Sequence, residues 1–141
     1  VIGVDVDASM IATARRLGPT ITWHVADMCE LRLDHRFEVV VMAGNVPLFT
    51  PPGTQAALVA GCARHLTAGG ALVCGFQLGG AYNVVDYDDH CRVAGLELAA
   101  RWSTWDQDLF PGDGGYAVSV HRRGSRTVEA GVAATADLES L

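Results

Sequence analysis

The chain has 141 residues, of which 50% are apolar and 18% are charged. This length and composition indicate one globular domain with a sizeable core, and they exclude a disordered or fibrous chain. Ten lysine and arginine residues stand against 16 aspartate and glutamate residues, so the formal net charge is −6. An acidic chain without a basic cluster argues against nucleic acid as a partner.

The same sequence predicts a cytoplasmic protein that makes no contact with a membrane. No apolar run reaches the roughly 18–20 residues that a membrane span requires. The apolar segment at residues 1–6 is too short for a signal peptide and has no basic residues before it. The cysteines form no C-x-x-C pair, and we expect reduced thiols at Cys29, Cys62, Cys74 and Cys91.

Six short segments are rich in β-branched residues or alternate apolar with polar side chains, which is typical of β-strands. In chain order they are residues 1–6, 21–25, 37–42, 71–76, 96–104 and 116–120. The third segment is almost continuously apolar, so we expect both of its faces to be covered. A turn at residues 67–70 is expected to lead into the fourth.

Three helices are predicted between these strands, ending near residues 17, 66 and 94. Each is expected to begin at a residue whose side-chain oxygen can accept a hydrogen bond from the first turn. The expected caps are Asp7 or Ser9, Thr54 and Asp86.

This alternation indicates an α/β fold: an open, mostly parallel, Rossmann-like sheet with helices on both faces. Residues 106–115 show no helical period, so the last two strands are expected to form a C-terminal antiparallel hairpin. We assign residues 1–123 to one α/β domain. Residues 124–141 are rich in Gly, Ala and Thr and are expected to form a peripheral or flexible tail.

Ligands of such sheets bind beyond the carboxyl ends of the strands. Asp5 ends the first strand, where a carboxylate can accept hydrogen bonds from the two hydroxyls of a ribose; its alternative role is to cap a helix. Asp27 follows the second strand and could accept from an exocyclic amine while the Met28 N–H donates to a ring nitrogen. The alternative for Asp27 is a solvated acid in a loop.

Two further groups of residues are candidates for contact with the same ligand. The side chains of Val6 and Met10 could pack on an aromatic base, although Met10 also fits the apolar stripe of its helix. After the third strand come Ala43, Gly44 and Asn45. Gly44 permits close approach of a ligand, and Asn45 offers an uncharged donor and acceptor; a simple Gly/Asn turn is the alternative.

Taken in order, these segments resemble a class I S-adenosylmethionine-dependent methyltransferase, from Val1 to about Arg123. The matching pieces are residues 3–10, 25–28, 37–41, 43–46, 66–73 and the closing hairpin. The resemblance implies that S-adenosylmethionine is the cofactor and that its methyl group passes to a small-molecule acceptor. Because such a transfer depends mainly on holding donor and acceptor in line, we assign no general base.

The resemblance also implies a role for each candidate residue. Asp5 would hold the ribose hydroxyls of the cofactor, and Val6 and Met10 would flank its adenine. Asp27, with the Met28 N–H, would recognise the edge of the adenine. The methionine part of the cofactor and the methyl-transfer side would be lined by Ala43, Gly44 and Asn45.

One departure from the family pattern concerns the start of the sheet. Family members begin with a strand and a Gly-rich loop, whereas this sequence begins at the family's second strand, so we expect an N-terminally truncated domain. In the family's strand order, 3-2-1-4-5-7-6, the absent strand is central. We therefore expect a fragment of a longer protein, strands that close up directly, or a partner chain, such as the second copy in a homodimer, that fills the gap. Without that strand, cofactor affinity should be weak or absent.

Two other functions stay open from the residues alone. A fragment of a NAD-dependent dehydrogenase would also place an acid after the second strand, although the closing hairpin argues against it. A degenerate α/β domain could instead serve as a non-catalytic dimerisation module. The histidines and cysteines show no repeated metal-ligand spacing, so we expect no metal site at His24, His35, His65, His90 or His121.

Overall fold

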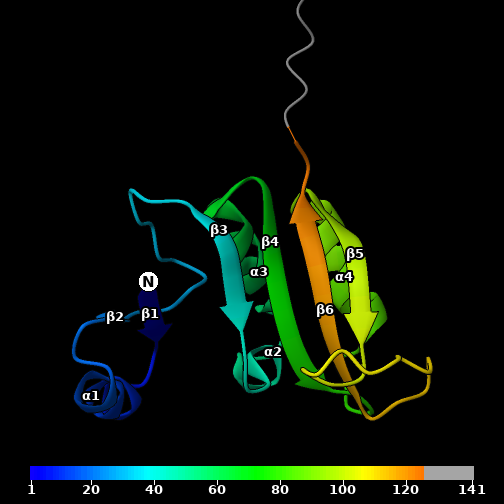
Figure 1. Cartoon of the computed structure of the whole chain (residues 1–141), viewed down its shortest axis with the longest axis horizontal. Helices are drawn as coiled ribbons and strands as arrows, with labels where there is room; N and C mark the ends of the chain where they lie inside the picture. Colours follow the sequence, from blue (N-terminus) through cyan, green and yellow to red (C-terminus); the bar gives the residue numbers. More distant parts are fainter. Residues whose placement is uncertain (126–141) are drawn as a thin grey trace, which may run out of the picture.

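The computed structural model describes residues 1–125, which form six strands and four helices (Figure 1). Most of the expected tail, residues 126–141, lies outside the described residues. The elements are β1 (Ile2–Asp5), α1 (Ala8–Leu17), β2 (Thr22–Val25), β3 (Phe37–Met42), α2 (Val46–Phe49), α3 (Gln55–Arg64), β4 (Leu66–Gln77), α4 (Val84–Val93), β5 (Leu96–Trp102) and β6 (Tyr116–Arg123).

The strands form two sheets instead of one. β1 and β2 pair in parallel, in a register that sets Asp5 opposite Val25. The second sheet has the order β3-β4-β6-β5, in which β3 and β4 are parallel and β6 is antiparallel to both of its neighbours. In Figure 1 the arrowheads of β1, β3 and β4 point to the same end of the molecule. The expected α/β fold and C-terminal antiparallel hairpin are confirmed.

Helices α3 and α4 lie behind the four-stranded sheet and cover one face of it (Figure 1). Alternate residues of β4 point into the core between them; Leu72, Cys74 and Phe76 are fully buried. The cysteines are all free thiols, and burial raises the pKa of Cys62 and Cys91 to about 12. These two thiols therefore stay protonated near neutral pH and act as small apolar core residues.

Three details of the secondary structure differ from the expectation. Thr54 stands at the start of α3 as expected, but its side chain makes no capping bond, because its hydroxyl donates to the carbonyl of Pro51 at 2.6 Å. The turn expected at 67–70 is a bulge inside the long strand β4. Phe37 pairs with Leu66 and Val39 pairs with Ala71, so four residues of β4 lie opposite a single residue of β3. The cap of α4 is Asn83, whose side-chain oxygen accepts from the N–H groups of Val85 and Asp86 at 2.9 and 3.0 Å. The expected cap, Asp86, lies in the first turn of that helix.

The expectation that both faces of β3 are covered is wrong. Val40 packs against the core on the side of the helices, but Val39 and Val41 are 53% and 56% exposed. The continuous apolar run therefore predicts burial correctly for only one face of β3. The other face stays open because no segment among residues 1–125 packs over these two side chains closely enough to shield them.

A cavity of about 330 Å³ separates β1 from β3, and we call it the slot. The expectation that the strands close up directly is therefore wrong. The loop at residues 26–36 holds the two sheets apart because it is anchored on α3. In that anchor, the N–H of Leu33 donates to His65 Nε2 at 3.0 Å, and Arg64 donates to the carbonyl of Leu31 at 3.0 Å. A Cβ on Gly61 would overlap the carbonyl oxygen of Met28, so only glycine allows this close packing.

Candidate functional site

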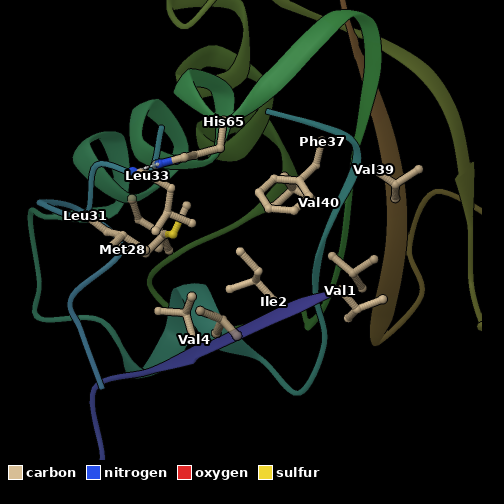
Figure 2. A pocket seen from close by; sticks show the side chains of 13 residues that line it. Val1, Ile2, Val4, Met28, Leu31, Leu33, Phe37, Val39, Val40 and His65 are labelled. Carbon is tan, nitrogen blue, oxygen red and sulfur yellow. Dashed lines mark hydrogen bonds between the residues drawn. The ribbon is translucent and has the colours of Figure 1, made fainter. Parts of the chain in front are cut away.

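The slot is lined almost entirely by apolar side chains from the two flanking strands and the anchored loop. In Figure 2, Ile2 and Val4 lie on the β1 side and Phe37 and Val40 lie on the β3 side. Met28, Leu31, Leu33 and His65 close the slot toward α3. Both flanking strands have an unpaired edge here, because β1 pairs only with β2 and β3 pairs only with β4 among the described residues.

Three of the predicted polar site residues gather at the carboxyl end of these strands. Asp5, Asp27 and Asn45 do not line the slot themselves, but each directly adjoins a residue that does. Asp5 and Asp27 are brought together by the β1–β2 pair, because the N–H of Ala26 donates to the carbonyl of Asp5 at 3.0 Å. Asn45 stands on the other side, after β3.

Asp5 and Asp7 divide between them the two roles that an acid can have at this position. Asp7 caps α1: its carboxylate accepts from the N–H of Ser9 at 2.7 Å and from that of Met10 at 3.3 Å. The hydroxyl of Ser9 donates to the same oxygen, and this bond is the main cause that lowers the pKa of Asp7. Asp5 accepts one bond, from the Asp7 N–H at 2.8 Å, and its other oxygen has no partner within residues 1–125. Asp5 is thus left with capacity for a ligand.

The loop after β2 offers one acceptor and one donor side by side. Asp27 is exposed, and one of its carboxylate oxygens accepts from the Cys29 N–H at 2.8 Å. The backbone N–H of Met28 donates to no group in the described part of the chain. An exposed carboxylate next to an open N–H can recognise an amine and a ring nitrogen on one edge of a base.

Val6 and Met10 point their apolar side chains to solvent. They are 67% and 59% exposed, and the residue that α1 buries is Ile11. Met10 is therefore not part of the core, which was the alternative for this residue. Two exposed apolar side chains beside Asp5 are suited to contact the faces of a flat ring.

The segment after β3 is a tight turn in the left-handed region of backbone space. Gly44 has a φ of 80° and Asn45 has a φ of 63°, a conformation that asparagine tolerates better than most residues. The N–H of Asn45 donates to the carbonyl of Gly75 at 3.3 Å, and its side-chain oxygen accepts from the N–H of Gln77 at 2.8 Å. The turn fixes Asn45 against β4 and leaves its side-chain amide hydrogens without a partner among the described residues. Ala43 precedes this turn and is exposed.

Two site features escaped the sequence analysis. His65 is 2% exposed and lines the slot; it accepts from Leu33 through Nε2, and its Nδ1 lies 2.7 Å from the Gly61 carbonyl. Because Nε2 accepts from a backbone N–H, the Nδ1 atom is the one that donates, to the Gly61 carbonyl. The anchoring of the loop on α3 was missed as well, because it joins residues more than 30 positions apart that no local pattern connects.

Comparison with known proteins shows what this chain is similar to. A family model described as a methyltransferase domain matches residues 1–70. No curated protein matches the sequence. The chain is similar in structure to a TehB-like SAM-dependent methyltransferase from Corynebacterium glutamicum, with 29% identity and a TM-score of 0.82 over 87% of this chain and 67% of that one.

Two further solved structures share the fold. The CcbJ methyltransferase from Streptomyces caelestis has 18% identity and a TM-score of 0.79, over 89% of this chain and 75% of that one. SAM-bound CalS10, an amino pentose methyltransferase from Micromonospora echinaspora, has 19% identity and a TM-score of 0.68, over 85% of this chain and 73% of that one. These comparisons give no support to a dehydrogenase fragment or to a non-catalytic module. Within residues 1–125, no helix is long and apolar enough to cross a membrane.

Proposed function

This chain belongs to the class I S-adenosylmethionine-dependent methyltransferases, and we propose that its cofactor lies across the carboxyl ends of β1, β2 and β3. One observation carries this placement: Asp5, Asp27 and Asn45 come from three strand ends at one edge, and each keeps hydrogen-bonding capacity. Because the strands are parallel, that edge is where ligands of such sheets bind.

Each residue has a role that its free groups support. The open oxygen of Asp5 accepts from the ribose hydroxyls, and Val6 and Met10 cover the adenine. Asp27 and the Met28 N–H recognise the edge of the adenine, and the free amide of Asn45 donates toward the methionine part. When bound, S-adenosylmethionine supplies a methyl group carried on a positively charged sulfur. The residues of this chain bind and orient the reactants, and we assign no residue as a proton acceptor.

We further propose that an extended apolar strand fills the slot in the active protein. The support is the unpaired edges of β1 and β3 and the apolar lining between them. Each backbone group left unpaired in an apolar setting costs roughly 1–3 kcal/mol, so a strand parallel to both edges relieves a large penalty. A second copy of the chain in a homodimer is one source of that strand, as the sequence analysis suggested.

The acceptor in this proposal is a small molecule. CalS10, which shares the fold, is described as an amino pentose methyltransferase, and the acidic composition of the chain argues against a nucleic acid substrate. A cytoplasmic location is supported by the four free cysteines, which is the usual state in a reducing compartment.

Saturation-transfer NMR on the full chain with S-adenosylhomocysteine tests the cofactor site and detects weak binding. In the wild type, the ribose and adenine protons should receive saturation. The substitution Asp5→Asn keeps the size of the side chain but removes its charge, and it should weaken binding about tenfold or more, because hydrogen bonds to charged groups contribute about 1.5–3 kcal/mol.

The matched control is Glu97→Gln, which removes one negative charge at an exposed position of β5 and should leave binding unchanged. Equal binding by the wild type and Asp5→Asn would refute the role of Asp5. Stronger saturation of NAD than of S-adenosylhomocysteine in the wild type would refute the site as a whole.

A further inference from the structure

Exposed apolar side chains gather near Asn45, at the end of the sheet where the methyl group is proposed to lie. Phe49 in α2 is 80% exposed, and on the loop between β5 and β6 Trp105 and Leu109 are 46% and 88% exposed. Figure 1 shows α2 and this loop at the same end of the four-stranded sheet. None of the roles proposed above uses these side chains.

Gly75 in β4 connects the two groups. Its carbonyl accepts from the N–H of Asn45 at 3.3 Å. On its side-chain face, a Cβ would lie 2.5 Å from the hydroxyl of Tyr116 and 2.6 Å from Cζ2 of Trp105. The absence of a side chain therefore lets the indole and the phenol lie against the strand, directly beside the residue that holds Asn45.

The orientation of the indole is set by one hydrogen bond. Trp105 Nε1 donates to the Tyr116 hydroxyl at 3.0 Å. That hydroxyl has a hydrogen of its own, for which residues 1–125 provide no acceptor. The pair thus presents an aromatic surface and one free O–H donor.

The loop that carries Trp105 is held in shape before any ligand binds. The N–H of Ser103 donates to the carbonyl of Asp108 at 2.9 Å, and the hydroxyl of Thr104 donates to the carboxylate of Asp108 at 2.8 Å. At the other end of the loop, the N–H of Leu78 donates to the carbonyl of Gly115 at 2.9 Å. A platform that is already ordered loses little conformational entropy on binding.

We propose that Trp105, oriented by Tyr116 over Gly75, selects the methyl acceptor: a small molecule with a flat aromatic ring and a hydrogen-bond acceptor. The ring lies on the indole, and the acceptor atom takes the free hydrogen of the Tyr116 hydroxyl. This inference rests on the proposed function, because it places the acceptor next to the methyl group that Asn45 flanks.

The test compares two neutral ketones of similar size on the full chain, acetophenone and cyclohexyl methyl ketone, by saturation-transfer NMR. Acetophenone should bind about threefold or more tightly, the order expected for stacking of aromatic rings. Trp105→Ala should abolish this preference and Trp105→Phe should restore it. Tyr116→Phe should weaken binding of cyclohexyl methyl ketone about fivefold, the value of one ordinary hydrogen bond. It should weaken binding of acetophenone by more, because the indole also loses the bond that orients it.

Val93→Ala, at an exposed apolar position of α4, is the control for general loss of apolar surface and should change nothing. Equal binding of the two ketones, or an unchanged preference in Trp105→Ala, would overturn the inference. S-adenosylhomocysteine binding is measured on the same variants and should not respond to Trp105→Ala. Failure of the cofactor to bind a chain that still prefers acetophenone would count against the proposed function alone.

Discussion

The role of a single residue in this chain depends on the hydrogen bonds that it already makes within the fold. Asp5 and Asp7 are two positions apart and chemically identical, yet Asp7 accepts three hydrogen bonds from Ser9 and Met10 and Asp5 accepts one. The carboxylate with the fewer internal partners is the one available to a ligand. The sequence predicted Asp7 or Ser9 as the cap, and the hydrogen bonds of Asp7 confirm the first of these two.

His121 is a residue whose protonation should control stability. It is 1% exposed, its Nε2 donates to Asp88 at 2.9 Å, and its Nδ1 is buried without a partner. Burial is the main cause that lowers the pKa of His121 below its ordinary 6.5, and the nearby guanidinium of Arg101 acts in the same direction. The Asp88 carboxylate opposes both effects only in part.

We predict that the free energy of unfolding decreases as the pH falls below about 6.5, by up to about 1.4 kcal/mol per pH unit. The sign follows because the unfolded chain binds a proton at His121 at a higher pH than the folded chain does. Urea denaturation at pH 7.5, 6.5 and 5.5 measures this slope. His121→Gln should flatten it, whereas His35→Gln, at an exposed position, should not. An equal slope in the wild type and His121→Gln would contradict the assignment.

At the scale of elements, α1 and α4 each begin at a residue whose side chain accepts hydrogen bonds from the first turn. Asn83 caps α4 by accepting from the N–H groups of Val85 and Asp86, although the sequence predicted the acid Asp86 as the cap. We predict that Asn83→Ala lowers the free energy of unfolding by about 1 kcal/mol. Asp86→Ala should cost less, because its side chain is not the cap. Chemical denaturation of both variants tests this, and a larger loss in Asp86→Ala would show that the cap is misassigned.

The contact between α3 and the loop at 26–36 reverses the usual effect of a helical glycine. Replacing glycine by alanine inside a helix ordinarily stabilises by about 1 kcal/mol. At Gly61 the new Cβ would overlap the carbonyl oxygen of Met28. We predict that Gly61→Ala lowers the free energy of unfolding and weakens S-adenosylhomocysteine binding, because Met28 must move.

The neighbouring position Ala60 supplies the control. Ala60 is exposed in the same helix, so Ala60→Gly should lower stability by about 1 kcal/mol through propensity alone and leave ligand binding unchanged. If Gly61→Ala stabilises the protein, propensity rather than packing governs this helix and the contact with Met28 is unimportant.

Most elements could be predicted from sequence because their signals are local. Strands β1 to β3 and helix α1 appear where apolar periodicity and capping residues place them. The bulge in β4 was expected as a turn because Gly69-Gly70 signals a break in regular structure, but pairing with β3 continues on both sides of it, and pairing with β6 begins directly after it at Ala71. The left-handed Asn45 could be suspected from its type; its bond to Gln77 could not, since it spans 32 positions.

At the scale of the whole molecule, the main feature is an incomplete sheet. The strand order of the family predicts a gap in the sheet, and the slot between β1 and β3 lies at that place. What the sequence did not reveal is why the gap stays open. Its width depends on the anchoring of one loop on α3, through contacts of Leu33 and Arg64 that depend on the assembled fold.

Hydrogen exchange measured by NMR should reflect this incomplete pairing. We predict that amides of β1 and β3 directed into the slot exchange rapidly, whereas those of β4 exchange slowly because β4 is paired on both sides. Adding a soluble peptide with a central run of alternating valine and isoleucine should slow exchange in β1 and β3 together. A scrambled peptide rich in glycine and proline serves as the control. Uniformly slow exchange in β1 and β3 without peptide would show that the slot is closed in solution.

The anchored loop makes the proposed recognition of adenine dependent on α3, a helix that carries none of the proposed ligand-binding residues. The Met28 N–H is positioned by the packing of its own carbonyl on Gly61, and the far end of the loop is fastened through His65. A random mutational screen for loss of nucleoside binding should consequently recover buried positions of α3 alongside Asp5 and Asp27. In those variants the ligand-binding residues would be unchanged but the loop that carries them would be displaced. Second-site changes that restore the packing of the loop on α3 should therefore rescue binding.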